Sequence, residues 1–171
     1  MVYTLRNSSN TDGLLELIKE LEPSTIMAEI GCYTGESSLM FIQSGKVRML
    51  YCIDPFTSNY DTTDTVSESD FKEVEKLFDI NTHNLPVTKM KMCFTDAFNE
   101  LPELDFIYID GDHRYEAVKN DIKLAFKKVK KGGIIAGHDY CNECEGVIRA
   151  VNEFFGKPNK IYSDSSWMVR L

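Results

Sequence analysis

The sequence has no long hydrophobic run. Its longest uninterrupted apolar stretches, such as Met49–Cys52 and Ile134–Ala136, are far shorter than the roughly 20 residues that a membrane-spanning helix needs. The first ten residues, Met1–Asn10, are polar and contain no apolar core of a signal peptide. These absences predict that the chain does not insert in a membrane, and we expect it in the cytoplasm.

Positive charge is also scarce. The chain has 19 Lys and Arg against 27 Asp and Glu, so its formal net charge at pH 7 is −8. A protein that binds nucleic acid through the phosphates needs an excess of Lys and Arg, because these side chains displace the bound counterions. The charge balance therefore argues against nucleic acid as a partner.

Internal repeats and low-complexity segments are absent as well. A length of 171 residues suits one domain, residues 1–171, and a chain of this size buries enough surface for a stable core. Hydrophobic residues make up 43% and charged residues 27%, close to the average of globular proteins. This composition excludes a disordered or fibrous chain.

Cysteine is present, but in an odd number that does not suit a disulfide framework. Three of the five, Cys32, Cys52 and Cys93, lie in or beside predicted strands, where cysteine acts as a small hydrophobic residue. We therefore expect reduced thiols.

Short apolar runs alternate with helical patterns along the chain. Strands are predicted at Thr25–Ile30, Arg48–Ile53, Lys89–Cys93, Leu104–Ile109 and Ile134–Ala136, with a terminal hairpin at Lys160–Tyr162 and Trp167–Leu171. Helices are predicted from Thr11 or Asp12 to a point before Pro23, and at Glu36–Gln43, Asp70–Asn81, Tyr115–Val129 and Val147–Phe155. The alternation predicts an α/β fold, with a doubly wound, mostly parallel sheet and an antiparallel edge. In such sheets ligands bind at the carboxyl ends of the strands.

The segment Thr57–Ser69 is rich in Ser, Thr, Asp and Asn, and we expect a loop there. Loops of this length in compact domains often act as lids over a site. It directly follows one of the predicted strand ends, where a ligand is expected.

The first predicted strand ends in Glu29-Ile30-Gly31-Cys32-Tyr33-Thr34-Gly35. Glycines let the backbone approach a ligand closely, and the turn directs that ligand to the start of the next helix. The dinucleotide-binding fingerprint would need glycine where Tyr33 stands, and a phosphate-binding loop would end in Gly-Lys-Ser/Thr. Alone, the motif fits a cofactor-binding turn and a plain strand-to-helix turn equally well.

Polar residues follow the second and third predicted strands. Asp54 lies 25 residues after Glu29 at the end of the neighbouring strand, where a carboxylate can accept both hydroxyls of a ribose. The alternative is a cap for the loop after Pro55. Thr95 and Asp96 either contact an adenine edge or cap the next short helix.

The fourth and fifth strand ends carry three carboxylates and two imidazoles, from Asp110, Asp112, His113, His138 and Asp139. Asp110, His138 and Asp139 have the ligand types to hold one divalent cation, and such a mixed set suits Mg, Mn, Fe or Zn. His113 lies one helical turn from Asp110, and the ordinary near-neutral pKa of histidine suits a general base for a substrate hydroxyl. Taken singly, each residue also fits a turn or a helix cap.

With these motifs in order, the sequence resembles the class I S-adenosylmethionine-dependent methyltransferases, and specifically the small O-methyltransferases of sugars and natural products. The resemblance covers about residues 26–171 and rests on the 29–35 turn, Ile53-Asp54-Pro55, Ile109-Asp110-Gly111-Asp112-His113, and Gly132-Gly133 followed by His138-Asp139-Tyr140. It implies a Rossmann-like, three-layer α/β/α fold with a seven-stranded sheet in the order 3-2-1-4-5-7-6 and an antiparallel last strand. It also implies S-adenosylmethionine as cofactor and O-methylation of a sugar or another small molecule.

The resemblance assigns roles to individual residues. In relatives that use a metal, an acidic residue and a later acidic or amide pair hold it, and Asp110 with His138-Asp139 occupies those places. His138 stands where the family usually has Asp, so the identity of a metal stays open. His113 matches the base of some sugar-modifying relatives, with Asp110 beside it as the second catalytic residue. The implied cofactor-binding residues are Glu29, Gly31, Cys32, Tyr33 and Gly35 at the methionine part, Asp54 at the ribose, Thr95 and Asp96 at the adenine, and Asp110.

Other interpretations stay open. His138-x-x-Cys141-x-x-Cys144 has the residue types of a zinc or redox site, without the second Cys/His pair that a four-ligand structural site needs. A methyltransferase of adenine or cytosine amino groups would carry Asn/Asp-Pro-Pro-aromatic after the fourth strand, where Asp110 to His113 stand. The chain is short for the family and lacks the helices that often cover the substrate. A cofactor-binding module without turnover, a partner-dependent subunit such as a homodimer, or a protein or nucleic-acid acceptor are therefore the alternatives.

Overall fold

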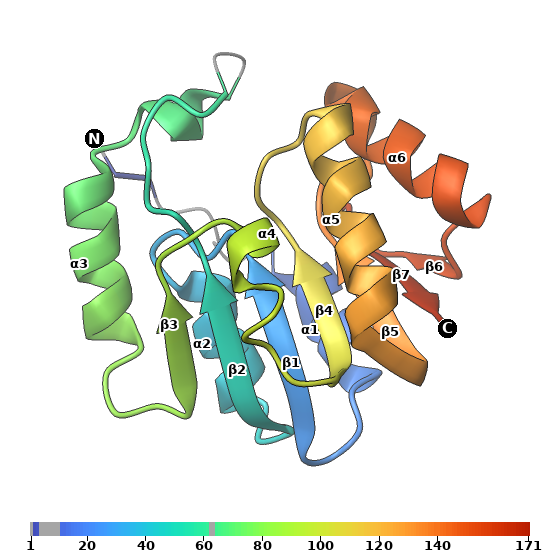
Figure 1. Cartoon of the computed structure of the whole chain (residues 1–171), viewed down its shortest axis with the longest axis horizontal. Helices are drawn as coiled ribbons and strands as arrows, with labels where there is room; N and C mark the ends of the chain where they lie inside the picture. The colour runs from blue at the N-terminus through green and yellow to red at the C-terminus, as the bar shows by residue number, and fades with distance from the viewer. Residues whose placement is uncertain (1, 4–10, 62–63) are drawn as a thin grey trace.

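Seven strands form one sheet in the order β3-β2-β1-β4-β5-β7-β6. The structure, a computed structural model, describes residues 2–3, 11–61 and 64–171. The parallel strands all point toward the upper edge of Figure 1, and β7 runs antiparallel to β5 and β6. The strands are β1 (Thr25–Ile30), β2 (Val47–Ile53), β3 (Val87–Met90), β4 (Leu104–Ile109), β5 (Val129–Gly137), β6 (Lys160–Ile161) and β7 (Trp167–Arg170).

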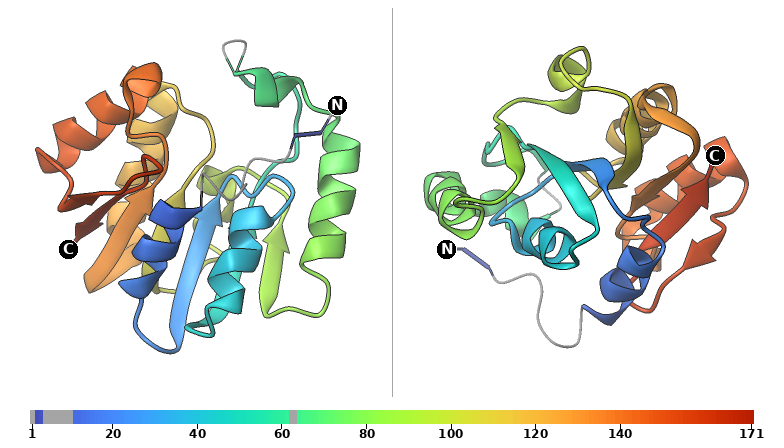
Figure 2. Two further views of the ribbon diagram at one scale, coloured as in Figure 1. Left: turned by 180° about the vertical axis from the view of Figure 1, so that it is seen from behind. Right: turned by 90° about the horizontal axis from the view of Figure 1, so that it is seen from below.

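Helices cover both faces of this sheet (Figures 1 and 2). On one face lie α1 (Asp12–Lys19), α2 (Glu36–Gln43) and α3 (Phe71–Asn81). On the other lie α4 (Phe94–Ala97), α5 (Tyr115–Lys128) and α6 (Glu145–Phe155), and two short 3-10 helices are η1 (Thr65–Glu68) and η2 (Asn142–Cys144). The fold is therefore the expected three-layer α/β/α arrangement.

Each face of the sheet has its own apolar core because successive side chains of a strand point to opposite faces. Along β1, Ala28 packs with the α5 and α6 side, while Met27 packs with the α1 and α2 side. Phe41 of α2 and Trp167 of β7 are fully buried in these two cores. The parallel strands thus have both faces covered, which leaves their carboxyl ends as the open edge.

The predicted sheet order and antiparallel edge are confirmed, and β1, β4 and α2 have the predicted bounds. The third strand is wrong in its bounds: it ends at Met90, because the Met92 N–H bonds back to the Met90 carbonyl at 2.9 Å and turns the chain toward α4. Cys93 is consequently exposed rather than part of a strand. All five cysteines are free thiols, as expected.

The loop predicted at Thr57–Ser69 contains the 3-10 turn η1, which Asp64 begins by accepting the Val66 N–H at 2.8 Å. Positions 62 and 63 of this segment lie outside the described residues. Among the helices that the structure describes, none has the length and hydropathy to cross a bilayer.

Candidate active site

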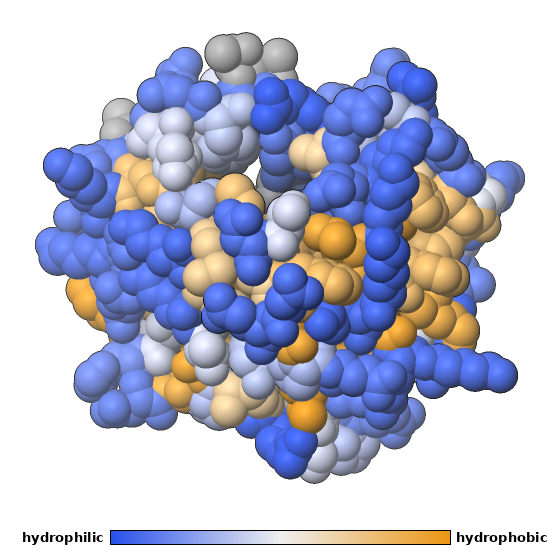
Figure 3. All heavy atoms as spheres, in the orientation of Figure 1, coloured by the Kyte–Doolittle hydropathy of each residue, from blue (hydrophilic) through white to orange (hydrophobic). Residues whose placement is uncertain are grey.

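A cavity of about 850 Å³ opens at the carboxyl edge of the sheet. Its walls come from the turn after β1, the segment after β2, the residues after β3, the loop after β4 with the start of α5, the residues after β5, and residues 163–165. In Figure 3 the surface is hollowed between the segment after β2 and the loop after β4. The cavity lies where parallel α/β sheets bind their ligands, and its size suits a cofactor together with a small substrate.

Gly31 makes the close approach of β1 and β4 at the cavity possible. Its φ is +81°, and a Cβ atom there would lie 2.3 Å from the Asp110 carbonyl oxygen. Only glycine takes this conformation without strain and leaves room for the neighbouring strand. The first glycine of the predicted turn is therefore required by the backbone.

Asp54 joins the turn after β1 to the end of β2. Its Oδ2 accepts the N–H groups of Cys32 and Tyr33 at 2.9 and 3.0 Å, and its Oδ1 accepts the Phe56 N–H at 2.7 Å. Burial raises the pKa of Asp54, although these three hydrogen bonds favour its charged form. A carboxylate oxygen accepts about two hydrogen bonds, so Oδ1 retains capacity for one ribose hydroxyl.

Glu29 does not line the cavity. Its side chain is fully buried on the α2 side of β1, where the hydroxyls of Ser37 and Ser38 donate to its two oxygens. Ser37 does line the cavity, so Glu29 lies one hydrogen bond behind the wall. The structure therefore places Glu29, one of the expected cofactor residues, behind the wall of the cavity rather than on its surface.

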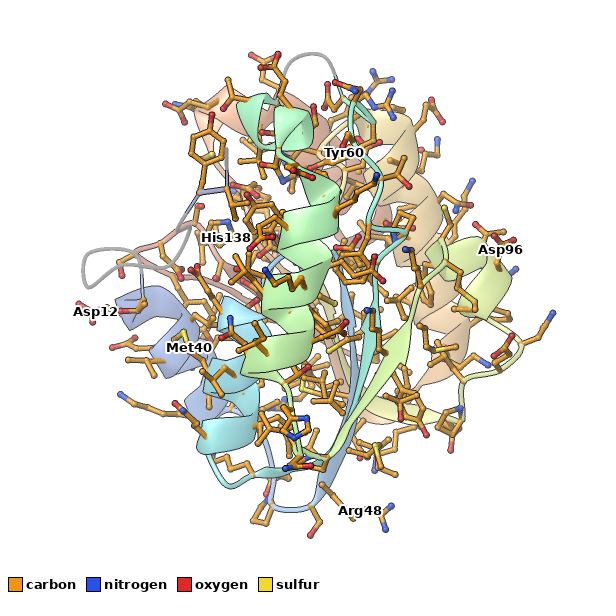
Figure 4. The ribbon with its side chains drawn as sticks, turned by 90° about the vertical axis from the view of Figure 1, so that its left-hand side faces the viewer. Asp12, Met40, Arg48, Tyr60, Asp96 and His138 are labelled. Atoms are coloured by element: carbon orange, nitrogen blue, oxygen red, sulfur yellow. The ribbon has the colours of Figure 1, made fainter. Side chains whose placement is uncertain are left out.

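Two other expected cofactor residues also lie away from the cavity. A Cβ atom at Gly35, where φ is +81°, would meet the side chains of Phe78 in α3 and Thr82 directly after α3. Asp96 is exposed on α4 and lies at the outer edge in Figure 4. The other expected cofactor residues do line it, namely Gly31, Cys32, Tyr33, Asp54, Thr95 and Asp110. Thr34 joins them with a buried hydroxyl that has no hydrogen-bond partner in the described part of the chain. That hydroxyl fits a polar group of a ligand.

Asp139 lies between two imidazoles at the ends of β4 and β5. Its Oδ2 is 3.0 Å from Nε2 of His113, and its Oδ1 is 3.1 Å from Nδ1 of His138. Asp110 completes the group, with Oδ1 3.8 Å from the same Nδ1 of His138. The structure therefore brings together all four residues that the sequence assigned to catalysis or to a metal.

This group has the donor atoms of a divalent-cation site. Ligand atoms of Asp110, His113 and Asp139 all lie within 4.8 Å of one another. His138 Nδ1 is also near both carboxylates, at 3.8 Å from Asp110 and 3.1 Å from Asp139. Mixed carboxylate and imidazole ligands suit Mn, Fe or Zn better than Mg, which prefers oxygen.

The pairing with Asp139 changes the protonation of His113. Burial lowers the pKa of His113, but the hydrogen bond to Asp139 and the charges of Asp139, Asp110 and Asp64 outweigh it and raise the pKa to about 9. For the carboxylate of Asp139 the directions are reversed: burial raises its pKa, but the hydrogen bonds from His113 and His138 outweigh burial and bring the pKa below its ordinary range. The pKa of His113 is therefore higher than the near-neutral value expected from the sequence. The cause is the ion pair with Asp139, which the sequence does not reveal.

Trp167 fixes the backbone that carries His138. The indole N–H donates to the His138 carbonyl at 3.2 Å, and the His138 N–H bonds to the Ile109 carbonyl at 3.0 Å. A Cβ atom at Gly137 would lie 2.4 Å from that Ile109 oxygen and 2.9 Å from the indole. Trp167, the first residue of the second strand of the predicted terminal hairpin, thus also positions a residue of the site.

Asp121 is a cavity residue that the sequence reasoning missed. It lies on α5 one turn after Ala117, and both line the cavity. Burial raises the pKa of Asp121 to about 7, and the charge of Asp112 contributes. The helical spacing of these two residues, read against the apolar face of α5, could have indicated a second face turned to the cavity.

Cys141 and Cys144 group with Asp139 rather than with His138. One ligand atom of each of these three residues lies within 4.8 Å of the others, which is fewer than the four ligands of a structural zinc site. Burial and the charge of Asp139 raise the pKa of Cys144 to about 12, so its thiol is protonated at neutral pH. The zinc interpretation gains no fourth ligand from the described residues.

Known proteins resemble this chain in sequence and fold. Residues 28–140 match the model of a family described as a methyltransferase domain. The uncharacterized protein R132 of Acanthamoeba polyphaga mimivirus is 33% identical over 117 residues, which are 66% of this chain and 50% of that protein. The chain thus spans about half the length of this relative.

Two solved O-methyltransferases share the fold. The structure of the O-methyltransferase NovP aligns with a TM-score of 0.69 at 16% identity, covering 98% of this chain and 81% of that one. A TDP-rhamnose 3′-O-methyltransferase of calicheamicin biosynthesis aligns with a TM-score of 0.61 at 16% identity, covering 94% and 76%. At these identities the likeness is one of fold.

Proposed function

The chain belongs to this family of S-adenosylmethionine-dependent methyltransferase domains, and from that premise we propose that it methylates a hydroxyl of a small molecule such as a sugar. One observation carries the proposal: a single cavity contains both the turn after β1 with Asp54 and the group of Asp110, His113 and Asp139. The first part suits a nucleoside cofactor and the second suits an acceptor hydroxyl. The sugar-modifying enzyme of the same fold supports the choice of acceptor.

The cofactor would lie along the β1, β2 and β3 ends. Gly31 and the backbone of Cys32 and Tyr33 let its methionine part approach the start of α2, and Asp54 would bind its ribose. Thr95 would lie near its adenine. The sulfonium is cationic, and the acidic residues of the cavity favour it.

Methyl transfer is a displacement in line with the breaking bond. When bound, S-adenosylmethionine would supply the methyl group to the acceptor oxygen, and S-adenosylhomocysteine would leave with the electron pair of the broken carbon–sulfur bond. Such a reaction depends on orientation of the acceptor and on removal of its proton.

His113 would take that proton. Its Nε2 lies 3.0 Å from Asp139, and its pKa of about 9 leaves the imidazole protonated at neutral pH. Its other nitrogen, Nδ1, would therefore accept the substrate proton only after the ring has released a proton to solvent. Asp139 and Asp110 hold the imidazole beside the acceptor position. A divalent cation held by Asp110, His138 and Asp139 would lower the pKa of the acceptor hydroxyl and leave His113 to take the proton.

Calorimetry with S-adenosylhomocysteine tests the cofactor half of the proposal, and a panel of sugars and phenols with labelled S-adenosylmethionine tests the transfer. We expect micromolar cofactor binding and methylation of at least one hydroxyl compound. Repeating the assay after chelation and after addition of Mn²⁺ or Mg²⁺ tests the cation. A wild-type chain that binds no cofactor overturns the proposal, and binding without transfer to any acceptor favours a non-catalytic module.

A further inference from the structure

One part of the cavity wall, which includes the Tyr33 side chain of the turn after β1, combines aromatic rings with carboxylates. We call this the acceptor end and define it by Tyr33, Tyr60, Asp64, Phe71 and Asp112, which all line the cavity. Figure 4 shows Tyr60 and His138 at the carboxyl end of the sheet, with Arg48 at the opposite end. His113 lines the same cavity, so the acceptor end and the reacting group face one space.

The three rings hold one another in place. Tyr33 and Tyr60 each meet Phe71 edge to face, with ring centroids 6.0 and 6.1 Å apart. The Tyr33 hydroxyl is 2.8 Å from Oγ of Ser69, and the Tyr60 hydroxyl donates to Oδ2 of Asp64 at 3.1 Å. A rigid group of aromatic rings beside a carboxylate is the arrangement that proteins use to bind ammonium groups.

Negative charge dominates the cavity wall. Arg114 is the only Lys or Arg among the described residues that line it, and its guanidinium pairs with Asp112. The acidic residues that line the cavity are Glu36, Asp54, Asp64, Asp110, Asp112, Asp121, Asp139 and Asp164. Even with a cationic cofactor and a divalent cation in place, the acidic residues of the wall outnumber the positive charges. An acceptor that carries phosphate would meet like charge, whereas an ammonium would meet opposite charge.

We propose that the acceptor is a polyhydroxylated compound with an ammonium group, as in an amino sugar; this inference rests on the proposed function. Tyr60 and Asp64 hold the ammonium, and a neighbouring hydroxyl of the same molecule faces His113. Asp64 and the aromatic rings thus select the acceptor by its charge, independently of the groups that move the proton.

Three glucose derivatives that differ in charge test this selection: methyl glucosaminide, methyl glucoside and glucose 6-phosphate. Ligand-detected NMR in the presence of S-adenosylhomocysteine measures binding without any turnover. We expect the amine to bind at least about tenfold more tightly than the neutral sugar, the gain that about 1.4 kcal/mol from a carboxylate and aromatic rings gives. We expect the phosphate to bind most weakly. Added salt should reduce the preference.

Asp64→Asn removes the charge and keeps an oxygen that can accept the Val66 N–H. We expect this variant to lose most of the preference for the amine, as we do for Tyr60→Leu. Asp70→Asn is the matched control, because Asp70 caps α3 by accepting the Lys72 N–H at 3.1 Å and does not line the cavity. We expect it to keep the preference.

Equal binding of the three sugars, tighter binding of the phosphate, binding of none, or an unchanged preference in Asp64→Asn overturns this inference. Each of these results leaves the proposed methyltransferase function in place, because calorimetry with S-adenosylhomocysteine measures that function separately.

Discussion

The two halves of the cavity are built by different means. The cofactor half consists of backbone: the positive φ of Gly31 and the N–H groups of Cys32, Tyr33 and Phe56 that meet Asp54. The reacting half consists of paired side chains, such as His113 with Asp139 from two different loops and Tyr60 with Asp64 within one loop. A position whose backbone needs a positive φ and a close approach accepts few residue types, whereas a position that contributes only a side chain to a pair accepts many. The first half is therefore fixed for one ligand, and the second half is open to change between acceptors.

The largest effect on stability and cofactor binding should come from adding a side chain at Gly31 in the cofactor half. Gly31→Ala places a Cβ atom 2.3 Å from the Asp110 carbonyl oxygen at a positive φ, and we expect it to lower the free energy of unfolding by about 3 kcal/mol or more and to abolish cofactor binding. Gly45→Ala is the control, since Gly45 has φ +70° and nothing within 4 Å of the added atom. It should cost only about 1 kcal/mol in urea unfolding. Equal costs for the two variants would contradict the close approach.

The reacting half should separate turnover from binding. His113→Ala should reduce kcat by about a hundredfold or more, the usual contribution of a general base, and leave the affinity for S-adenosylhomocysteine within a factor of two. Steady-state kinetics and calorimetry on the same preparation measure both. The exposed His83→Ala is the matched control and should change neither. A large loss of cofactor affinity in His113→Ala would show that the two halves are not separate.

Asp54→Ala should show the opposite pattern in the cofactor half. It removes the acceptor of three N–H groups and the expected ribose partner, so we expect about a tenfold to thirtyfold weaker binding of S-adenosylhomocysteine. At saturating cofactor, kcat should fall much less than KM rises. A normal affinity measured by calorimetry would sink the assignment of Asp54 to the ribose.

The smallest effect concerns stability and pH. The pKa of Asp121 is raised to about 7 in the fold from an ordinary value of 3.8, so the folded state binds more protons between these pH values and stability falls as pH rises through them. Asp121→Asn removes this loss, and we expect it to be about 1–2 kcal/mol more stable than the wild type at pH 8 and no more stable at pH 4.

Chemical unfolding at the two pH values measures this difference. Glu100→Gln removes a charge from an exposed residue and should show no such dependence on pH. If Asp121→Asn raises the free energy of unfolding as much at pH 4 as at pH 8, burial does not hold the Asp121 carboxyl in its neutral form.

The sequence predicted the backbone half better than the side-chain half, for a physical reason. The turn at Gly31 and the placement of Asp54 depend on local geometry and on neighbouring strands, which motifs and spacing reveal. The ion pair of His113 with Asp139 depends on the exact approach of two loops, and no local pattern encodes it. The position of the Glu29 side chain also could not be predicted from its motif. Its hydrogen-bond partners Ser37 and Ser38 lie on the next helix and hold it behind the wall of the cavity.

The contact of the Trp167 indole with His138 links the reacting half of the cavity to the last strand of the chain. β7 is the last of the seven strands to leave the ribosome, yet it inserts beside β5 and holds the His138 carbonyl. The cofactor half is built at the ends of β1, β2 and β3 with β4 beside β1, and all of these strands precede β7 in the chain. During translation the residues of the cofactor half are therefore complete before the strand that positions His138 is made.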